Sequence, residues 1–274
     1  MSQKGGPLAA PEPWDLVSKG YAEEASYLMR AFSVRAIELM EPGVSARVID
    51  VAAGPGTLTL ELAQRVASID AIDFAPAMIE ELQAALVTRN ITNVTARVAD
   101  GQSLPFGDER FDFGFSMFGL MFFPDRPRGY SELLRVLKPG GRAVVSSWAP
   151  LMDSSLMRGM FGAIHEVDPN VPPPQRDPLG LENPDVLAAE LTAAGFRDVA
   201  VEAVTRFVPP ITSAEEVWHR MSRSSAPLVL LRNRLGESEW QRGTERARAF
   251  LERYLRENPG ELSSTALLGY GTKP

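Results

Sequence analysis

The sequence predicts an α/β protein whose strands form one doubly wound, parallel sheet. Strand-like and helix-like segments alternate in four steps between residues 47 and 148, and this alternation is typical of βαβ units. The right-handed crossover rule then leaves few topologies for such a chain. With 274 residues, the chain is long enough to bury one substantial core.

The elements of the N-terminal half have recognisable boundaries. Residues 1–13 are rich in Gly, Pro and Ala and predict a loose arm, whereas the spacing of aromatic and aliphatic residues predicts a helix over 20–40. Glu41-Pro42-Gly43 ends that helix. The expected elements then follow as a strand at 47–51, a helix at 57–66, a strand at 68–73, a helix beginning near Pro76, strands at 94–99 and 111–116, a helix at 130–137, a turn at 138–141 and a strand at 143–148.

The C-terminal half is less regular. Residues 149–183 contain many prolines and a cluster of Met and Phe, and they predict an insertion over the sheet edge. Ser213 and Glu216 have the spacing of a capping box, so a helix is expected to begin there. The other expected elements are a helix at 184–194 capped by Gly195, an alternating strand at 199–207, an amphipathic helix from Trp240 to Leu255 and a last strand at 262–272.

Composition excludes several classes of function. Lys and Arg number 28 against 35 Asp and Glu, a net charge of −7 that counts against nucleic-acid binding. The absence of Cys excludes disulfides, zinc knuckles, iron–sulfur clusters and a cysteine nucleophile, and two His exclude a multi-histidine metal site. We find neither a signal-peptide core in the first residues nor an apolar run of the ~20 residues that cross a membrane. We therefore expect a cytoplasmic protein without a metal.

The first strand–turn–helix carries the functional motif. It runs Val48-Ile49-Asp50-Val51-Ala52-Ala53-Gly54-Pro55-Gly56-Thr57. Glycines allow close backbone approach to a ligand, and a helix start offers unpaired N–H groups to an anion. Asp73 ends the next strand 19 residues after Gly54, the offset at which a carboxylate meets a ribose in this architecture. Together they predict a site for a nucleoside that carries an anionic group.

A third acidic residue, Asp100, ends the third strand and suits the exocyclic amine of an adenine. Asp50, Asp73 and Asp100 then point to one edge of the sheet, where open α/β sheets bind ligands. The dinucleotide fingerprint G-x-G-x-x-G would place a glycine at position 59, which is Thr59 here. A tight pyrophosphate turn is therefore disfavoured, although the pattern leaves it open.

Five blocks, in order, resemble a class I S-adenosylmethionine-dependent methyltransferase of the branch that methylates small molecules and quinones. They are 48–57, 71–78, 99–106, 111–113 and 135–141. Two positions depart from the family pattern. Ala52 replaces the first glycine of D-x-G-x-G-x-G, and Met121-Phe122 stands where some relatives have a His-His pair. The second departure removes a catalytic histidine found in some relatives.

The resemblance implies a Rossmann-like, mostly parallel seven-stranded sheet with an N-terminal helical arm and helical cap insertions. It also implies S-adenosylmethionine as cofactor and S-adenosylhomocysteine as product. The expected organisation is an arm and lid helix over 1–42, a cofactor-binding core over 43–148, a cap insertion over 149–183 and the remainder of the sheet over 184–274 with a helical insertion near 211–258.

The resemblance also implies roles for individual residues. Asp50 would orient the glycine loop or the amino group of the cofactor. The other implied contacts are Ala52, Gly54 and Gly56 at the amino-acid end, Asp73 on the ribose hydroxyls, Phe74 and Met78 along the adenine, Asp100, Gly101 and Gln102 at its amine, Ser116, Met117 and Phe118 at the methionine part, and Tyr21 and Tyr27, with Trp14, closing over the site.

The chemistry requires few residues, because a sulfonium methyl is already activated and positioning supplies much of the rate. A hydroxyl acceptor would benefit from a general base. His165, in the predicted insertion, and Tyr21 are the candidates for a catalytic role, and His219 and Asp153 are weaker ones.

We therefore expect methyl transfer to a small, mainly apolar acceptor in small-molecule biosynthesis, with O-methylation as the first interpretation. A quinone or lipid C-methyltransferase fits the same blocks. An RNA or protein methyltransferase is disfavoured by the acidic charge and by the lack of an Asn/Asp-Pro-Pro-Tyr motif. A cofactor-binding cyclase or binding module and a nicotinamide dehydrogenase are the remaining alternatives, and a homodimer is left open.

Overall fold

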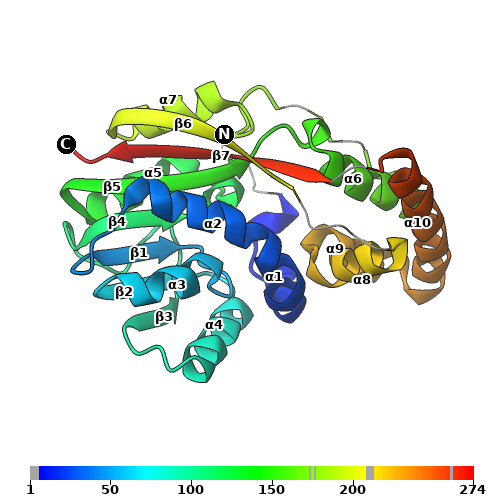
Figure 1. The fold of residues 1–274 in the computed structure, drawn as a ribbon, viewed down its shortest axis with the longest axis horizontal. Helices are drawn as coiled ribbons and strands as arrows, with labels where there is room; N and C mark the ends of the chain where they lie inside the picture. The colour runs from blue at the N-terminus through cyan, green and yellow to red at the C-terminus, as the bar shows by residue number, and fades with distance from the viewer. Residues whose placement is uncertain (1–5, 173, 176, 208–212, 260–261) are drawn as a thin grey trace.

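The computed structural model describes residues 6–172, 174–175, 177–207, 213–259 and 262–274. Seven strands form one sheet in the order β3-β2-β1-β4-β5-β7-β6 (Figure 1). Strand β7 alone runs opposite to the other six strands, so the sheet is mostly parallel and the predicted fold class is confirmed. The strands are β1 Arg47–Val51, β2 Ser68–Asp73, β3 Val94–Val98, β4 Phe111–Ser116, β5 Leu137–Trp148, β6 Arg197–Phe207 and β7 Ser263–Thr272.

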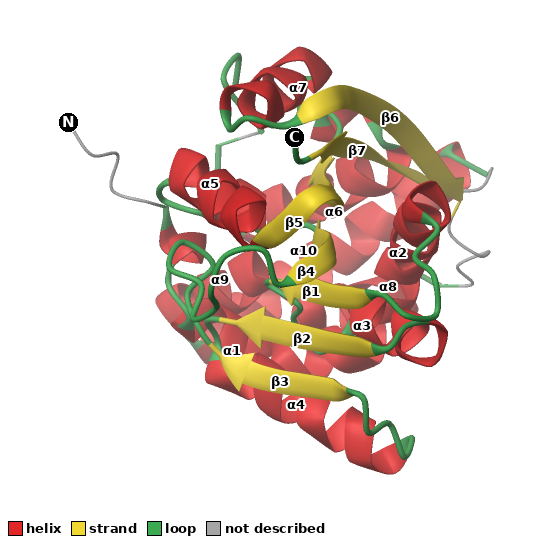
Figure 2. Ribbon diagram, turned by 90° about the vertical axis from the view of Figure 1, so that its left-hand side faces the viewer, coloured by secondary structure: helices red, strands yellow, loops and turns green. Residues whose placement is uncertain are grey.

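Helices cover both faces of the sheet because successive strand residues point to opposite sides. Val48 of β1 packs in the core under α2, α3 and α4, whereas Ile49 packs in the core under α5 and α7. Figure 2 shows the strands stacked above one another from β3 to β6, with α5 and α7 on one side of the sheet and α2 on the other. These helices are α2 Ser26–Met40, α3 Thr57–Leu62, α4 Pro76–Thr88, α5 Arg126–Val136 and α7 Pro184–Ala193.

Four helices form a cap beside the carboxyl ends of the parallel strands (Figure 1). They are α6 Ser155–Val167, α8 Ala214–Ser224, α9 Ala226–Leu235 and α10 Glu237–Glu257. The cap has its own apolar core, in which the rings of Trp218 and Trp240 lie 5.5 Å apart. Gly162 lets α6 approach α10 closely, since a Cβ there would lie 2.1 Å from Phe250 Cζ.

The N-terminal helices connect the cap to the sheet. Helix α1 Glu12–Gly20 continues through a π-helical turn, Tyr21–Ala25, into α2, and it packs against α4 as well as against α8 and α9. A Cβ at Gly20 would lie 2.1 Å from the Arg223 carbonyl oxygen. Arg223 also forms ion pairs with Glu23 and Glu24. The segment before the first strand therefore forms one wall between the sheet and the cap.

Most differences from the predicted elements lie where a proline or a bulge changes a boundary. The predicted loose arm is partly ordered, since its last residues begin helix α1 at Glu12. The first turn of α1 contains a proline, which is tolerated there because its missing N–H would have no partner within the helix. Residues 1–5 of that arm lie outside the described residues. Helix α5 begins at Arg126, four residues earlier than predicted, because the Asp125 side chain accepts a hydrogen bond from the Arg128 N–H.

The predicted turn at 138–141 lies inside β5. Pairing with β4 shifts from Phe111–Leu137 to Phe113–Arg142, so the extra residues form an irregular bulge in one strand. Helix α9 was not predicted by the sequence patterns. Among the described residues, the structure contains no helix long and apolar enough to cross a membrane.

Candidate active site

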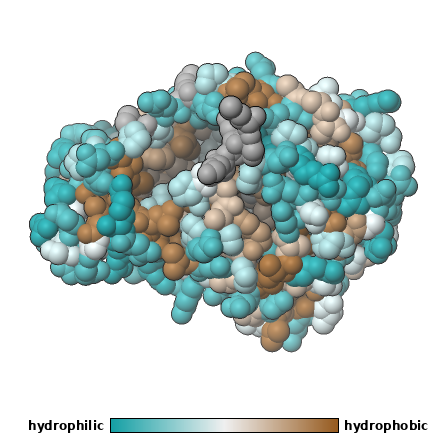
Figure 3. Space-filling view, turned by 180° about the vertical axis from the view of Figure 1, so that it is seen from behind, coloured by the Kyte–Doolittle hydropathy of each residue, from teal (hydrophilic) through white to brown (hydrophobic). Residues whose placement is uncertain are grey.

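A cavity of about 930 Å³ lies where the carboxyl ends of the first four strands meet the cap. This is the edge at which open α/β sheets bind ligands, and the volume is in the range of small-molecule sites. Its walls come from the N-terminal helices, the loops after β1, β2, β3 and β4, and helices α6, α8 and α9. In the view of Figure 3, brown apolar side chains gather on the cap side of the molecule.

The loop after β1 has three residues in the left-handed region. Ala52, Gly54 and Gly56 have φ values of 58°, 56° and 90°. Gly54 lines the cavity, and nothing would lie within 4 Å of a Cβ there, so the backbone presents an open face to a ligand. Gly56 does not line the cavity. A Cβ at Gly56 would lie 2.4 Å from Leu82 Cδ1, so this glycine serves the packing of α3 against α4.

Asp73 ties the end of β2 to this loop. Its Oδ2 accepts a hydrogen bond of 2.8 Å from the Gly54 N–H, and its Oδ1 accepts one of 3.0 Å from the Ala75 N–H. Burial raises the pKa of Asp73 to about 6, and the backbone N–H groups partly offset that rise. Because a carboxylate has about four lone-pair sites, Asp73 retains acceptor capacity toward the cavity that it lines.

Asp50 is fully buried below the loop. Its Oδ2 accepts a hydrogen bond of 2.6 Å from Thr59 Oγ1, so Thr59 serves to hold the first acidic residue. Burial raises the pKa of Asp50 to about 7, the Thr59 hydrogen bond opposes this, and the negative charge of Asp73 adds to the rise. The two carboxylates thus lie near each other in one poorly solvated site.

These raised pKa values predict that the cofactor-free chain loses stability as the pH rises. A carboxyl whose pKa is higher in the folded than in the unfolded chain stabilises the fold fully below the unfolded pKa near 4, and this stability is lost as the pH rises through the folded values of about 6 and 7. We expect an unfolding free energy at least ~2 kcal/mol lower at about pH 8 than at about pH 5. Denaturant titrations of the cofactor-free chain at the two pH values will measure this difference in unfolding free energy. Asp50→Asn should flatten the decline, and an equally steep decline in that variant would contradict the assignment.

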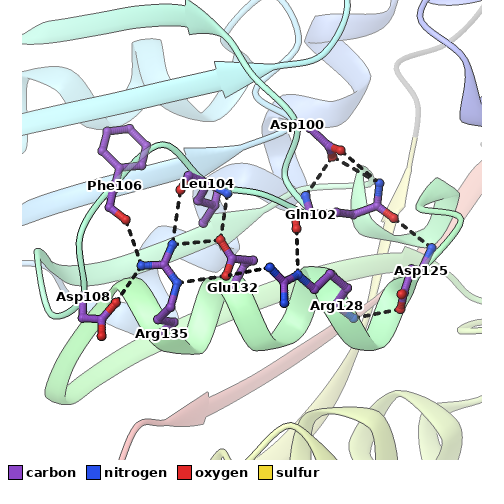
Figure 4. A network of polar contacts seen from close by, with 9 residues as sticks. All are labelled: Asp100, Gln102, Leu104, Phe106, Asp108, Asp125, Arg128, Glu132 and Arg135. Carbon is purple, nitrogen blue, oxygen red and sulfur yellow. Dashed lines mark hydrogen bonds and ion pairs between the residues drawn. The ribbon is translucent and has the colours of Figure 1, made fainter.

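The loop after β3 is fixed to α5 by a chain of polar contacts (Figure 4). Asp100 Oδ1 accepts hydrogen bonds from the Gln102 N–H at 2.8 Å and from Gln102 Nε2 at 3.1 Å. Gln102 Oε1 in turn accepts one of 2.9 Å from the Asp125 N–H. Gly101 packs closely, since a Cβ there would lie 2.5 Å from Phe123 Cζ. Asp100, Gly101 and Gln102 all line the cavity.

Apolar and aromatic residues complete this end of the cavity. Phe74 and Met78 line it just before and within α4, and Trp14, which belongs to the same apolar cluster, has its ring 5.1 Å from that of Phe122. Tyr27 lines it further along α2, with the Arg220 guanidinium 5.0 Å from its ring centre. The structure therefore brings the predicted aromatic residues of the N-terminal helices to the cavity.

Tyr21 lines the cavity from the π-helical turn between α1 and α2. Burial, with a smaller effect of the Asp73 charge, raises the pKa of the Tyr21 phenol to about 12. The phenol therefore remains protonated near neutral pH and can donate a hydrogen bond, whereas a general base would have to be ionised. We assign Tyr21 no role as a base.

Five predicted residues do not line the cavity. His165 is exposed on α6, and its Nδ1 lies 3.4 Å from the Val171 carbonyl oxygen, because α6 turns Phe161 and Ile164 toward the cavity instead. The predicted catalytic role of His165 is therefore not supported. Ser116 is buried behind the lining, as is Gly56. The weaker candidates His219 and Asp153 are exposed and also lie outside the lining.

An aromatic box lines the cavity beyond Met117, and of its three members the family resemblance implied Phe118 there and missed the other two. Phe32, Phe118 and Trp148 form this box, and the Phe118 and Trp148 ring centres lie 4.4 Å apart. Phe118 has a φ of 58°, a conformation that side chains rarely adopt, and its N–H donates to Ser146 Oγ at 2.8 Å. Further missed lining residues are Arg206 of β6 and Ser264 of β7.

Comparisons with known proteins agree with this geometry. Residues 48–141 match the family described as a methyltransferase domain. The chain is 38% identical over 120 residues to a ubiquinone/menaquinone biosynthesis C-methyltransferase of Geotalea daltonii, covering 42% of this chain and 50% of that protein. The chain spans about half the length of the curated relatives that it matches.

Solved structures share the fold over most of this chain at low sequence identity. YcgJ of Bacillus subtilis superposes with a TM-score of 0.57 and 19% identity over 88% of this chain and 97% of that one. The [4+2]-cyclase SpnF superposes with a TM-score of 0.57 and 21% identity over 89% of this chain and 80% of that one. Residues 48–141 are therefore similar to a methyltransferase domain, and the sheet and helices are arranged as in these structures, in agreement with the predicted class I S-adenosylmethionine-dependent methyltransferase family.

Proposed function

We propose that this chain is an S-adenosylmethionine-dependent methyltransferase that acts on a small, mainly apolar acceptor. The observation that carries the proposal is one continuous cavity. At one end it is lined by the acidic and glycine residues that suit a nucleoside, and at the other by the aromatic box and the apolar side chains of α6. Such a cavity holds two reactants together, and orienting them supplies much of the rate of methyl transfer.

The lining residues fit the cofactor chemically. The remaining lone pairs of Asp73 suit the two ribose hydroxyls, which are donors, and the open face of Gly54 accommodates the amino-acid part. Phe74 and Met78 provide an apolar wall for adenine, and Asp100 an acceptor for its amine. When bound, S-adenosylmethionine supplies an activated methyl group on a positively charged sulfur. The other proposed contacts are Asp50, Ala52, Gly101, Gln102, Met117, Tyr21 and Tyr27 in the lining, with Gly56 and Ser116 supporting it from behind.

The acceptor side contains no obvious base among the described residues. Glu24 lines the cavity, but its carboxylate is paired with Arg223 at 3.0 Å. Tyr21 remains protonated, and neither histidine lines the cavity. The acceptor atom must therefore be nucleophilic without strong assistance and release its proton to water. An acidic oxygen fulfils this condition, which supports O-methylation.

A C-methylation of an electron-rich quinol ring is the second candidate. It also needs no strong base, and it is favoured by the 34–38% identity to ubiquinone/menaquinone and demethylmenaquinone methyltransferases.

Cytoplasmic location and a homodimer remain predictions from sequence.

A screen of small acceptors tests the proposed function. The purified chain is incubated with S-adenosylmethionine and a panel of apolar phenols, carboxylic acids and quinols. We expect one class of acceptor to gain the mass of one CH2, with S-adenosylhomocysteine formed in equal amount, and NMR of the product to separate an O-methyl from a C-methyl group. Binding of the cofactor together with a substrate converted without mass gain would instead favour a cyclase.

A further inference from the structure

Ser264 has a buried hydroxyl group at the wall of the cavity. It lies at the start of β7, is 5% exposed and lines the cavity. Its Oγ has no hydrogen-bond partner among the described residues. Buried polar groups are nearly always paired, and an unpaired one calls for an explanation such as a ligand. The Ser264 hydroxyl is therefore available to an acceptor in the cavity.

Arg206 lies beside Ser264 on the same face of the sheet. The two residues are direct partners in the antiparallel pairing of β6 with β7, so their side chains project to the same side. Arg206 also lines the cavity, and the hydrogen bond it makes within the described residues goes to the Thr205 carbonyl oxygen at 3.3 Å. The carboxylate of Glu202 is already held by Arg35 through two hydrogen bonds of 2.8 and 2.9 Å.

We infer that Ser264 and Arg206 form an anchor for a carboxylate at the far end of the acceptor. A hydroxyl and a guanidinium both donate hydrogen bonds, and a guanidinium matches a carboxylate in shape and charge. This inference deepens the proposed function and rests on it, because the anchor has a purpose only if a methyl acceptor occupies the cavity.

The sheet order sets a lower limit on the distance between the anchor and the reacting end. The expected methionine part of the cofactor lies after β4, whereas Ser264 is on β7 and Arg206 is on β6, two and three strands away. At about 4.8 Å per strand, the anchor is displaced sideways by at least ~10 Å from the position of methyl transfer. The oxygen held by the anchor is therefore separate from the atom that is methylated.

The space between the two ends is apolar. It is lined by the aromatic box of Phe32, Phe118 and Trp148 and, from the cap, by Met157 and Met160. An acceptor that fills it has an elongated apolar body, a nucleophilic atom at one end and a carboxylate at the other.

A matched pair of probes tests the anchor. Decanoate and decanamide have the same apolar chain and differ in the charge of the end group. Each is titrated by calorimetry into the protein saturated with S-adenosylhomocysteine. We expect decanoate to bind at least tenfold more tightly than decanamide. Arg206→Met should remove this preference, because Met keeps the length of the side chain without its charge, and Ser264→Ala should reduce it.

Arg197→Met is the matched control. Arg197 lies on the same strand, is exposed and does not line the cavity, so this variant should keep the preference. Equal affinity for both probes, no binding of decanoate, or an unchanged preference in Arg206→Met would overturn the anchor. Failure of S-adenosylhomocysteine to bind would overturn the proposed function first, and the two failures are therefore distinguishable.

Discussion

Asp73→Asn is expected to weaken the binding of S-adenosylhomocysteine at least ~100-fold, about 2.7 kcal/mol. The Asp73 carboxylate accepts hydrogen bonds from the Gly54 and Ala75 N–H groups and lines the cavity where the ribose is proposed to bind. An amide has one acceptor oxygen, so its NH2 group must face either a backbone N–H or the ribose hydroxyls. Hydrogen bonds to charged groups contribute ~1.5–3 kcal/mol each, so the loss of one such acceptor accounts for the expected effect.

Asp70→Asn is the matched control for this variant. Asp70 lies on the same strand and forms an ion pair of 2.8 Å with Arg97, outside the cavity lining. Asp70→Asn removes the same charge as Asp73→Asn. It should leave the dissociation constant of S-adenosylhomocysteine within about threefold of that of the unaltered chain, because the Asp70–Arg97 ion pair is partly exposed and screened by salt. If Asp73→Asn folds normally and binds S-adenosylhomocysteine as tightly as Asp70→Asn does, the ribose assignment is wrong.

Gly119→Ala is expected to destabilise the chain by about 2 kcal/mol, and Ala52→Gly is expected to restore most of this loss. The φ of Gly119 is −97°, which alanine adopts without strain, so the cost comes from contact alone. A Cβ at Gly119 would lie 2.2 Å from the Ala52 Cβ. Ala52 itself has a φ of 58°, which explains why the family pattern has glycine there.

A double-mutant cycle measures this coupling through denaturant unfolding of the four chains. Ala52→Gly alone should be nearly neutral, because relief of left-handed strain of ~1–2 kcal/mol is offset by the backbone entropy of glycine, ~0.5–1 kcal/mol. The interaction energy should exceed about 1 kcal/mol. Additive effects of the two changes would show that the clash between the two Cβ atoms is not the cause.

The sequence predicted those features of the site that local spacing determines. Asp50, Asp73 and Asp100 follow three successive strands, and parallel strands necessarily present their carboxyl ends at one edge. The bounds of β1, β2 and β4 agree with the predicted ones for the same reason, since short buried strands between glycine and proline residues have clear limits.

Features that depend on long-range packing were not predictable in this way. Ser264 and Arg206 reach the cavity because β7 pairs between β5 and β6, and no local pattern specifies that pairing. His165 was expected near the substrate, but the face of α6 that points inward is set by its contacts with α10. Gly56 belongs to a motif that suggested cofactor contact, and its packing role becomes visible only with Leu82 in place.

The most direct test of the central claim is a calorimetric titration of the unaltered chain with S-adenosylmethionine, S-adenosylhomocysteine and NAD. The cavity combines the buried Asp73 carboxylate, which we propose binds ribose, with an open glycine backbone, and Thr59 occupies the third glycine position of a dinucleotide site. We expect each of the two sulfur nucleosides to bind with one molecule per chain and NAD to give no binding heat. Binding of NAD, or of none of the three, would contradict the account.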